Sequence, residues 1–69
     1  MDRAYGIDVV VGTSSESVEA AIRQAVQRVG ATRRHVDWFE VEQVRGYVKA
    51  NEVDHFQVTV KVGYRLEDS

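Results

Sequence analysis

The run VDHFQVTVKVGYRL, residues 53–66, constrains the fold more than any other part of this chain. Apolar side chains occupy every second position from Phe56 to Leu66, and polar residues or glycine occupy the positions between them. This period of two is typical of a β-strand with one buried face and one outward face. The chain contains no proline, so every residue of such a strand can donate its N–H to a neighbour. The run therefore predicts a long central strand.

The other elements follow from their own periodicities. Residues 4–12 (AYGIDVVVG) alternate and predict a first strand, and residues 35–48 predict a second strand joined to the third through the four-residue turn KANE. Between the first two strands, apolar residues recur at helical spacing, which predicts an amphipathic helix. The residues of this stripe are Val18, Ala21, Ile22, Ala25, Val26 and Val29.

The ends of the helix carry recognisable signals. Thr13 followed by Glu16 three residues later fits a capping box, and Ser14 is an alternative N-cap. Gly30 suits the left-handed position that follows many helices. We therefore expect about 16 helical residues, which span roughly 24 Å.

The order β-α-β-β predicts an α+β fold in which one helix covers one face of a three-stranded antiparallel sheet of strand order 1-3-2. The 69 residues form a single domain, residues 1–69. A third strand of about 14 residues is roughly 45 Å long, so it extends well beyond its helix. We expect Tyr64 and Leu66 to lie in this uncovered part and to be buried against another subunit.

Composition narrows the function. A domain of this size usually needs a disulfide, a metal or a partner subunit, and the chain has no cysteine and only two histidines, so oligomerisation is the favoured solution. A net charge of −2 argues against nucleic-acid binding. No apolar run reaches the roughly 20 residues of a membrane span, and no signal peptide is recognisable, which favours a cytoplasmic protein. No P-loop or nucleophile with an adjacent base is recognisable, so we expect no enzymatic activity.

Trp38, the only tryptophan, is the strongest candidate for a binding residue. If Val48 pairs with Val53, paired residue numbers sum to 101, and Trp38 falls opposite Gly63 on the face that lacks the helix. The indole then either fills the space left by the missing side chain, stacks on a flat ligand, or contacts another subunit.

Three polar residues accompany it. Gln57 shares the outer face, opposite Val44 in this register, about 20 Å from Trp38, so both could serve one ligand only from different subunits. Arg65 also points outward, and Arg45 points inward unless a bulge at Gly46 redirects it. The arginines suit phosphate groups, although from the residues alone solvated arginines, or ion pairs with Glu40 or Glu42, are the simpler interpretation. Gln57 is also compatible with an ordinary exposed strand position.

The segments VGTSSESVEAAIRQAVQR (11–28), HVDWFEVEQVRG (35–46) and HFQVTVKVGYRLEDS (55–69) resemble those of the dodecin family, in order and almost end to end. The resemblance implies a hollow homododecamer that binds FMN, riboflavin or another flavin and, in bacterial members, coenzyme A. It implies that Trp38 stacks on the flavin and Gln57 hydrogen-bonds its heteroatom edge, whereas Arg45 and Arg65 contact the phosphate-bearing parts of the ligands. The implied role is flavin storage, buffering and photoprotection, and the alternative is a coenzyme A-binding or structural assembly.

Overall fold

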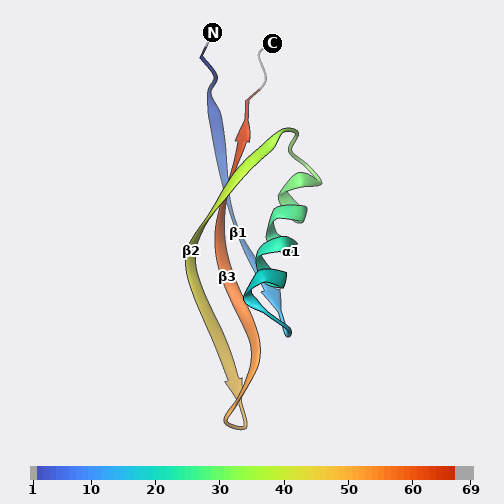
Figure 1. Cartoon of the computed structure of the whole chain (residues 1–69), viewed down its shortest axis with the longest axis vertical. Helices are drawn as coiled ribbons and strands as arrows, with labels where there is room; N and C mark the ends of the chain where they lie inside the picture. The colour runs from blue at the N-terminus through green and yellow to red at the C-terminus, as the bar shows by residue number, and fades with distance from the viewer. Residues whose placement is uncertain (1, 67–69) are drawn as a thin grey trace.

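A computed structural model describes residues 2–66, which form β1 (Tyr5–Ser14), α1 (Val18–Gly30), β2 (Val36–Lys49) and β3 (Glu52–Arg65). The sheet has the order β1-β3-β2, and both neighbours run antiparallel to β3. Figure 1 shows β3 between the other two strands and α1 against one side of the sheet. The molecule is elongated, with extents of 54 × 19 × 13 Å. The fold and the strand order predicted from the sequence are confirmed.

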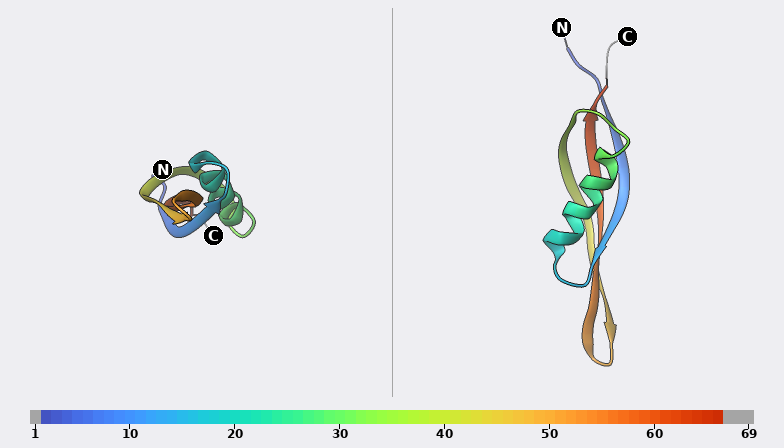
Figure 2. Two further views of the ribbon diagram at one scale, coloured as in Figure 1. Left: turned by 90° about the horizontal axis from the view of Figure 1, so that it is seen from below. Right: turned by 90° about the vertical axis from the view of Figure 1, so that its right-hand side faces the viewer.

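The core lies between α1 and the inner face of β3, where the predicted apolar stripe meets the alternating valines. Figure 2 shows the helix on one side of the curved sheet. Three valines of β3 and three residues of α1 are almost completely buried. They are Val58, Val60, Val62, Ala21, Ala25 and Val29. Alanines at two of the three helical positions allow α1 to approach the sheet closely.

The helix begins later than predicted. Ser17 is the N-cap, in an extended conformation, and its Oγ accepts a hydrogen bond of 3.0 Å from the N–H of Ala20. The predicted capping box at Thr13 and the alternative cap at Ser14 are both wrong, because β1 continues through Ser14. The Ser14 Oγ instead accepts a 2.9 Å hydrogen bond from the N–H of Glu16, which closes the turn between β1 and α1.

The helix ends without the predicted left-handed glycine. Gly30 is the last helical residue and has no positive φ, and the C-cap Ala31 has φ −71°. The N–H of Ala31 donates to the carbonyl oxygens of Gln27 and Arg28, so ordinary right-handed backbone satisfies the end of the helix. Because α1 has only 13 residues, no helix in the described chain is long and apolar enough to cross a membrane.

The sheet extends beyond the helix at one end, but not at the predicted end. Tyr64 is half-buried, with its ring over Gly6 and the guanidinium of Arg33 4.4 Å from the ring centroid. The uncovered end is the β2–β3 hairpin, where Val48 is 68% exposed (Figure 1). The reason is the path of the chain, since α1 must run back toward the start of β2 and therefore leaves the hairpin bare. Leu66, at the other end, is exposed as expected.

The hairpin turn is tighter than the predicted four residues. Lys49 pairs with Glu52, so only Ala50 and Asn51 lie in the turn, and both have positive φ, of 54° and 66°. Positive φ at both central residues is the pattern of a type I′ turn, whose twist matches that of the flanking strands. The pairing of Val48 with Val53, on which the predicted register depends, is confirmed.

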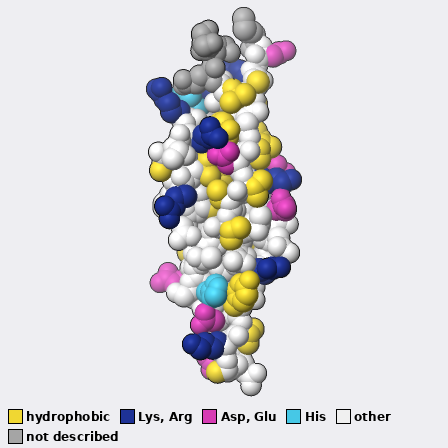
Figure 3. All heavy atoms as spheres, turned by 180° about the vertical axis from the view of Figure 1, so that it is seen from behind, with side chains coloured by type: hydrophobic (Ala, Val, Ile, Leu, Met, Phe, Trp, Pro, Cys, Tyr) yellow, Lys and Arg dark blue, Asp and Glu magenta, His cyan; other side chains and the backbone are white. Residues whose placement is uncertain are grey.

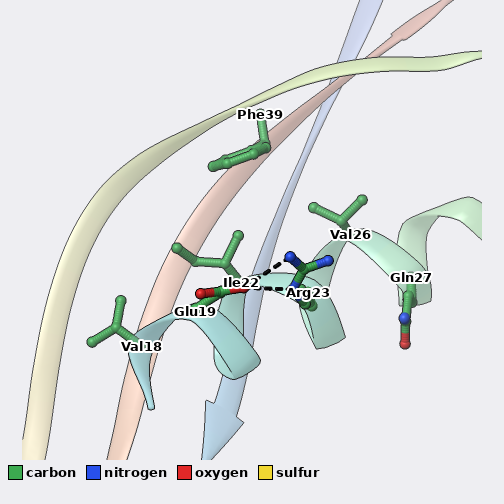
Figure 4. A pocket seen from close by; sticks show the side chains of 7 residues that line it. All are labelled: Val18, Glu19, Ile22, Arg23, Val26, Gln27 and Phe39. Carbon is green, nitrogen blue, oxygen red and sulfur yellow. Dashed lines mark hydrogen bonds and ion pairs between the residues drawn. The ribbon is translucent and has the colours of Figure 1, made fainter.

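The helix also leaves the inner face of β2 partly uncovered. A groove of about 460 Å³ runs between α1 and β2, lined by Val18, Ile22 and Val26 of the helix and by Phe39 of the strand (Figure 4). The Phe39 side chain is 48% exposed although it lies on the helix side of the sheet. The ion pair between Glu19 and Arg23, at 2.8 Å, lies along this groove.

Two glycine-to-alanine substitutions test how closely α1 packs on β1. A Cβ at Gly12 would overlap the carbonyl oxygen of Ala21 in the backbone of α1, so we expect Gly12→Ala to lower the stability by about 2 kcal/mol. Gly30→Ala is the matched control, because a Cβ there meets nothing within 4 Å and alanine favours the helix by about 0.5 kcal/mol. Thermal unfolding followed by circular dichroism measures both, and equal midpoints for the two variants would contradict the packing.

Candidate ligand site on the uncovered sheet face

A β-bulge in β2 determines which side chains share the outer face. The predicted strand register, in which the numbers of paired residues sum to 101, holds at Phe39, which lies opposite Val62. The register then shifts by one residue between Val41 and Gln43. Glu42 is therefore the extra residue of a bulge. Beyond it, each residue of β2 faces the side opposite to that predicted by simple alternation.

This shift corrects two predictions about the site. Gln57 lies opposite Arg45, not Val44. Directly opposed residues of antiparallel strands share a face, so Arg45 points outward with Gln57 rather than inward. A bulge that redirects Arg45 was expected at Gly46, and the structure has it earlier in the strand, at Glu42.

Trp38 lies where the sequence predicted, opposite Gly63 on the outer face. A Cβ at position 63 would overlap the indole, so the ring does cover the glycine. The ring of Tyr5 meets the indole edge-to-face, with ring centroids 5.2 Å apart and an interplanar angle of 68°. With its ring over Gly63 and in T-shaped contact with Tyr5, Trp38 is still 37% exposed. The glycine thus accounts for part of the indole surface, and more than a third of the residue remains available for a contact.

Tyr5 was not identified from the sequence as part of this site. It lies opposite Arg65 in the β1–β3 pairing, so it reaches the outer face beside Trp38. The sequence shows the alternation within β1 but does not show its register against β3. These two strands are not joined by a short hairpin, so no turn fixes which of their residues pair.

The second group of outer-face residues surrounds Gln57. The Gln57 side chain is half-buried, and its Oε1 accepts a hydrogen bond of 3.3 Å from the hydroxyl of Tyr47. The Tyr47 ring stacks on His55, with ring centroids 4.8 Å apart. Arg45 is exposed, and within residues 2–66 its side chain forms no hydrogen bond or ion pair. The predicted alternative of an ion pair with Glu42 is not observed, since Glu42 pairs with Lys61 at 3.7 Å.

The chain does not bring these two groups together. Gln57 and Gly63, the strand partner of Trp38, are six positions apart on β3, which corresponds to about 20 Å along an extended strand. Within one chain, Trp38 is accompanied by Tyr5 and Arg65, and Gln57 is accompanied by Arg45. No single small ligand can therefore touch both Trp38 and Gln57 of the same chain.

Arg65 is half-buried near the end of β3 and lines a pocket of about 220 Å³. Arg33 and Arg34 line the same pocket. Arg33 donates hydrogen bonds of 3.0 and 3.3 Å to the carboxylate of Asp8, and this pairing raises the pKa of Arg33 above its ordinary value. Three arginines thus line the pocket at the end of the sheet nearest Trp38, and one of them, Arg33, is neutralised by Asp8.

The outer surface combines apolar and charged side chains. Figure 3 shows apolar side chains spread along the length of one face, with charged groups beside them. The outward residues of β1 contribute Ile7, Val9 and Val11, of which Val9 is 58% exposed. Within residues 2–66, no group of three or more histidines and acids is arranged to hold a metal ion.

Comparison with known proteins identifies the family. The dodecin family model matches residues 5–67. This chain belongs to the dodecin family. Dodecins are small flavin-binding proteins and not enzymes, which agrees with the sequence-based expectation.

Individual dodecins match along the whole chain. The dodecin of Thermus thermophilus is 45% identical over 69 residues, which is 100% of both chains. The crystal structure of the tt0972 protein from Thermus thermophilus superposes with a TM-score of 0.93 at 44% identity, covering 99% of this chain and 100% of that one. The dodecin from Streptomyces coelicolor gives a TM-score of 0.91 at 48% identity, covering 99% and 97%.

The position of the indole can be tested without ligand. Trp38 is the only tryptophan, so all of the tryptophan fluorescence of the protein comes from this residue. Gly63→Ala places a Cβ where the indole lies, so we expect the ring to move off the strand and its emission maximum to shift to longer wavelength. Gly46→Ala is the control, since a Cβ there makes only an ordinary 3.5 Å contact with the carbonyl oxygen of His55. Identical emission spectra for both variants and the parent would refute the contact.

Proposed function

We propose that this dodecin assembles into a homododecamer that binds and stores flavin, FMN or riboflavin, in the cytoplasm without turning it over. The observation that carries the proposal is the exposed indole of Trp38 on the sheet face opposite the helix, about 20 Å from Gln57 along β3. A site that uses both residues has to be formed by more than one copy of the chain. Assembly and flavin binding are thus parts of one proposal.

Trp38 is suited to stacking on a flat heterocycle. Its ring already rests on Gly63 and against Tyr5, so little conformational freedom is lost when a second ring system covers its exposed part. Two flavins stacked on each other between the Trp38 residues of two copies would be shielded from water on their faces. Electron transfer from the indole would quench the excited flavin, which gives the assembly a protective role against flavin photochemistry.

The polar residues supply the remaining recognition. The amide of Gln57 can hydrogen-bond the carbonyl and imide edge of a flavin stacked on Trp38 of another copy. The Arg45 guanidinium is exposed and has no partner within the described residues, and Arg65 is near Trp38. Both arginines suit a phosphate, which makes FMN the preferred ligand over riboflavin.

The exposed apolar surface supports assembly. Ile7, Val9 and Val11 on the outer face, together with Phe39 and Val41 on the inner face, are all exposed in the single chain. A chain of 69 residues whose core, within residues 2–66, consists of six buried side chains has little stability of its own, so burial of these residues between copies would stabilise the fold.

Coenzyme A is a second candidate ligand, and the basic pocket at the end of β3 favours it. Arg65 lines this pocket with Arg33 and Arg34, and although Arg33 is paired with Asp8, guanidinium groups at such a site suit a phosphate-bearing ligand. An assembly that mainly carries coenzyme A would bind it equally well with or without a stacking residue at position 38. The stacking test therefore separates the two functions.

We expect Trp38→Ala to reduce flavin affinity about five- to 150-fold and to abolish fluorescence quenching of added riboflavin, because loss of a stacked aromatic ring costs about 1–3 kcal/mol. Trp38→Phe is the control, since it keeps a flat ring and should retain part of the affinity. Fluorescence titration measures binding, and size-exclusion chromatography with light scattering checks that the dodecamer persists. Unchanged affinity in Trp38→Ala would overturn the stacking role, and a stable monomeric parent protein would overturn the assembly.

The arginines are tested by comparing two ligands that differ in one phosphate. We expect Arg45→Ala and Arg65→Ala to weaken FMN binding at least tenfold and riboflavin binding much less, since a hydrogen bond to a charged group contributes about 1.5–3 kcal/mol. Arg23→Ala is the control, because Arg23 lies on the helix and is paired with Glu19. Equal losses for FMN and riboflavin would refute the phosphate assignment.

A further inference from the structure

The hairpin end of the sheet holds a connected series of polar side chains that begins at a second bulge. The β2–β3 pairing passes from Tyr47 opposite His55 to Val48 opposite Val53, which leaves Asp54 as an extra residue on β3. Adjacent strand residues normally point to opposite faces, and a bulge relaxes this rule. The Asp54 carboxylate consequently reaches the imidazole of the next residue, with 2.7 Å between Oδ2 and Nδ1 of His55.

His55 in turn positions Tyr47. The two rings stack at a centroid distance of 4.8 Å with an interplanar angle of 23°, and the Asp54 carboxylate contacts the Nδ1 atom at the edge of the imidazole. A phenol ring fixed in this way has its hydroxyl at a defined place. The hydroxyl lies beside Gln57, which is the next outward residue of β3 after His55. The Gln57 Oε1 accepts a hydrogen bond of 3.3 Å from this hydroxyl.

We infer that Tyr47 is a positioning residue that holds the Gln57 amide in place toward the hydrogen-bonding edge of the ligand. This inference rests on the proposed role of Gln57 in flavin binding. A free glutamine amide can rotate to offer either its oxygen or its NH₂ group. With one lone pair of Oε1 engaged by the Tyr47 hydroxyl, the amide keeps its two N–H donors and the second lone pair of Oε1 for a ligand, which suits an edge with a carbonyl oxygen beside an N–H group.

The arrangement also reduces the cost of binding. Glutamine loses more rotamer freedom on ordering than most side chains, and Gln57 is already tied to the rigid Tyr47 ring before a ligand arrives. The ligand class that fits is a flat heterocycle whose carbonyl oxygen lies in the ring plane, as in the isoalloxazine ring. Ligands with only N–H donors at this edge would bind less well.

Tyr47→Phe tests the inference, because it removes the hydroxyl and keeps the ring that stacks on His55. Riboflavin is the probe, since it has no phosphate for the arginines to bind. We expect Tyr47→Phe to weaken riboflavin binding about three- to tenfold, the range of one hydrogen bond. The same change made in a Gln57→Ala background should alter the affinity less than twofold, because Tyr47 acts only through Gln57. Tyr64→Phe, which removes a hydroxyl from the helix side of the sheet, should leave the affinity unchanged.

The outcomes separate this inference from the proposed function. Unchanged binding in Tyr47→Phe, or the same loss with and without Gln57, would overturn the positioning role while flavin binding itself stands. If the parent protein binds no riboflavin, the proposed function fails. The crystal structure of the ligand-free Tyr47→Phe variant then tests whether Tyr47 positions Gln57. Several Gln57 rotamers in that structure would support the positioning role, and the single rotamer of the parent protein would overturn it.

Discussion

One short helix for three strands is the constraint from which the rest of this structure follows. The 13 residues of α1 span about 20 Å, whereas the 14 residues of β3 span about 46 Å. The helix can bury only the inner face of β3 and the adjoining part of β1. The inner face of β2, the hairpin and the whole outer face of the sheet remain in contact with solvent, and the candidate ligand groups lie on that outer face.

The elements and their order could be predicted because each depends on a local pattern. The alternating valines of β3 and the apolar stripe of α1 report directly which face is buried, and the pairing of Trp38 with Gly63 follows from a short hairpin. The bulge at Glu42 could not be predicted, because a bulge is an interruption of alternation, and the polar residues around it fit either face. Arg45 was accordingly placed on the inner face unless a bulge at Gly46 redirected it, whereas the bulge that turns it outward lies at Glu42.

The remaining errors arise from contacts between segments distant in sequence. Thr13 was a reasonable N-cap by its spacing from Glu16, but its N–H bonds the side chain of Gln24 at 2.8 Å, and β1 continues past it. Tyr5 was missed because only the folded sheet brings it beside Trp38. Tyr47 was missed because its contact with Gln57 depends on the register after the bulge. Local periodicity thus predicts elements well, whereas the composition of a site depends on register.

The distance between Trp38 and Gln57 along β3 has a thermodynamic consequence for the proposed store. A ligand that needs surfaces from several copies binds only the associated form, so by mass action it draws free chains into the shell. Occupancy would then rise more steeply with total protein than a site within one chain allows, and dilution would release the cargo as the shell comes apart. Such a container would retain its contents when the cell makes much of it and return them when the cell makes little.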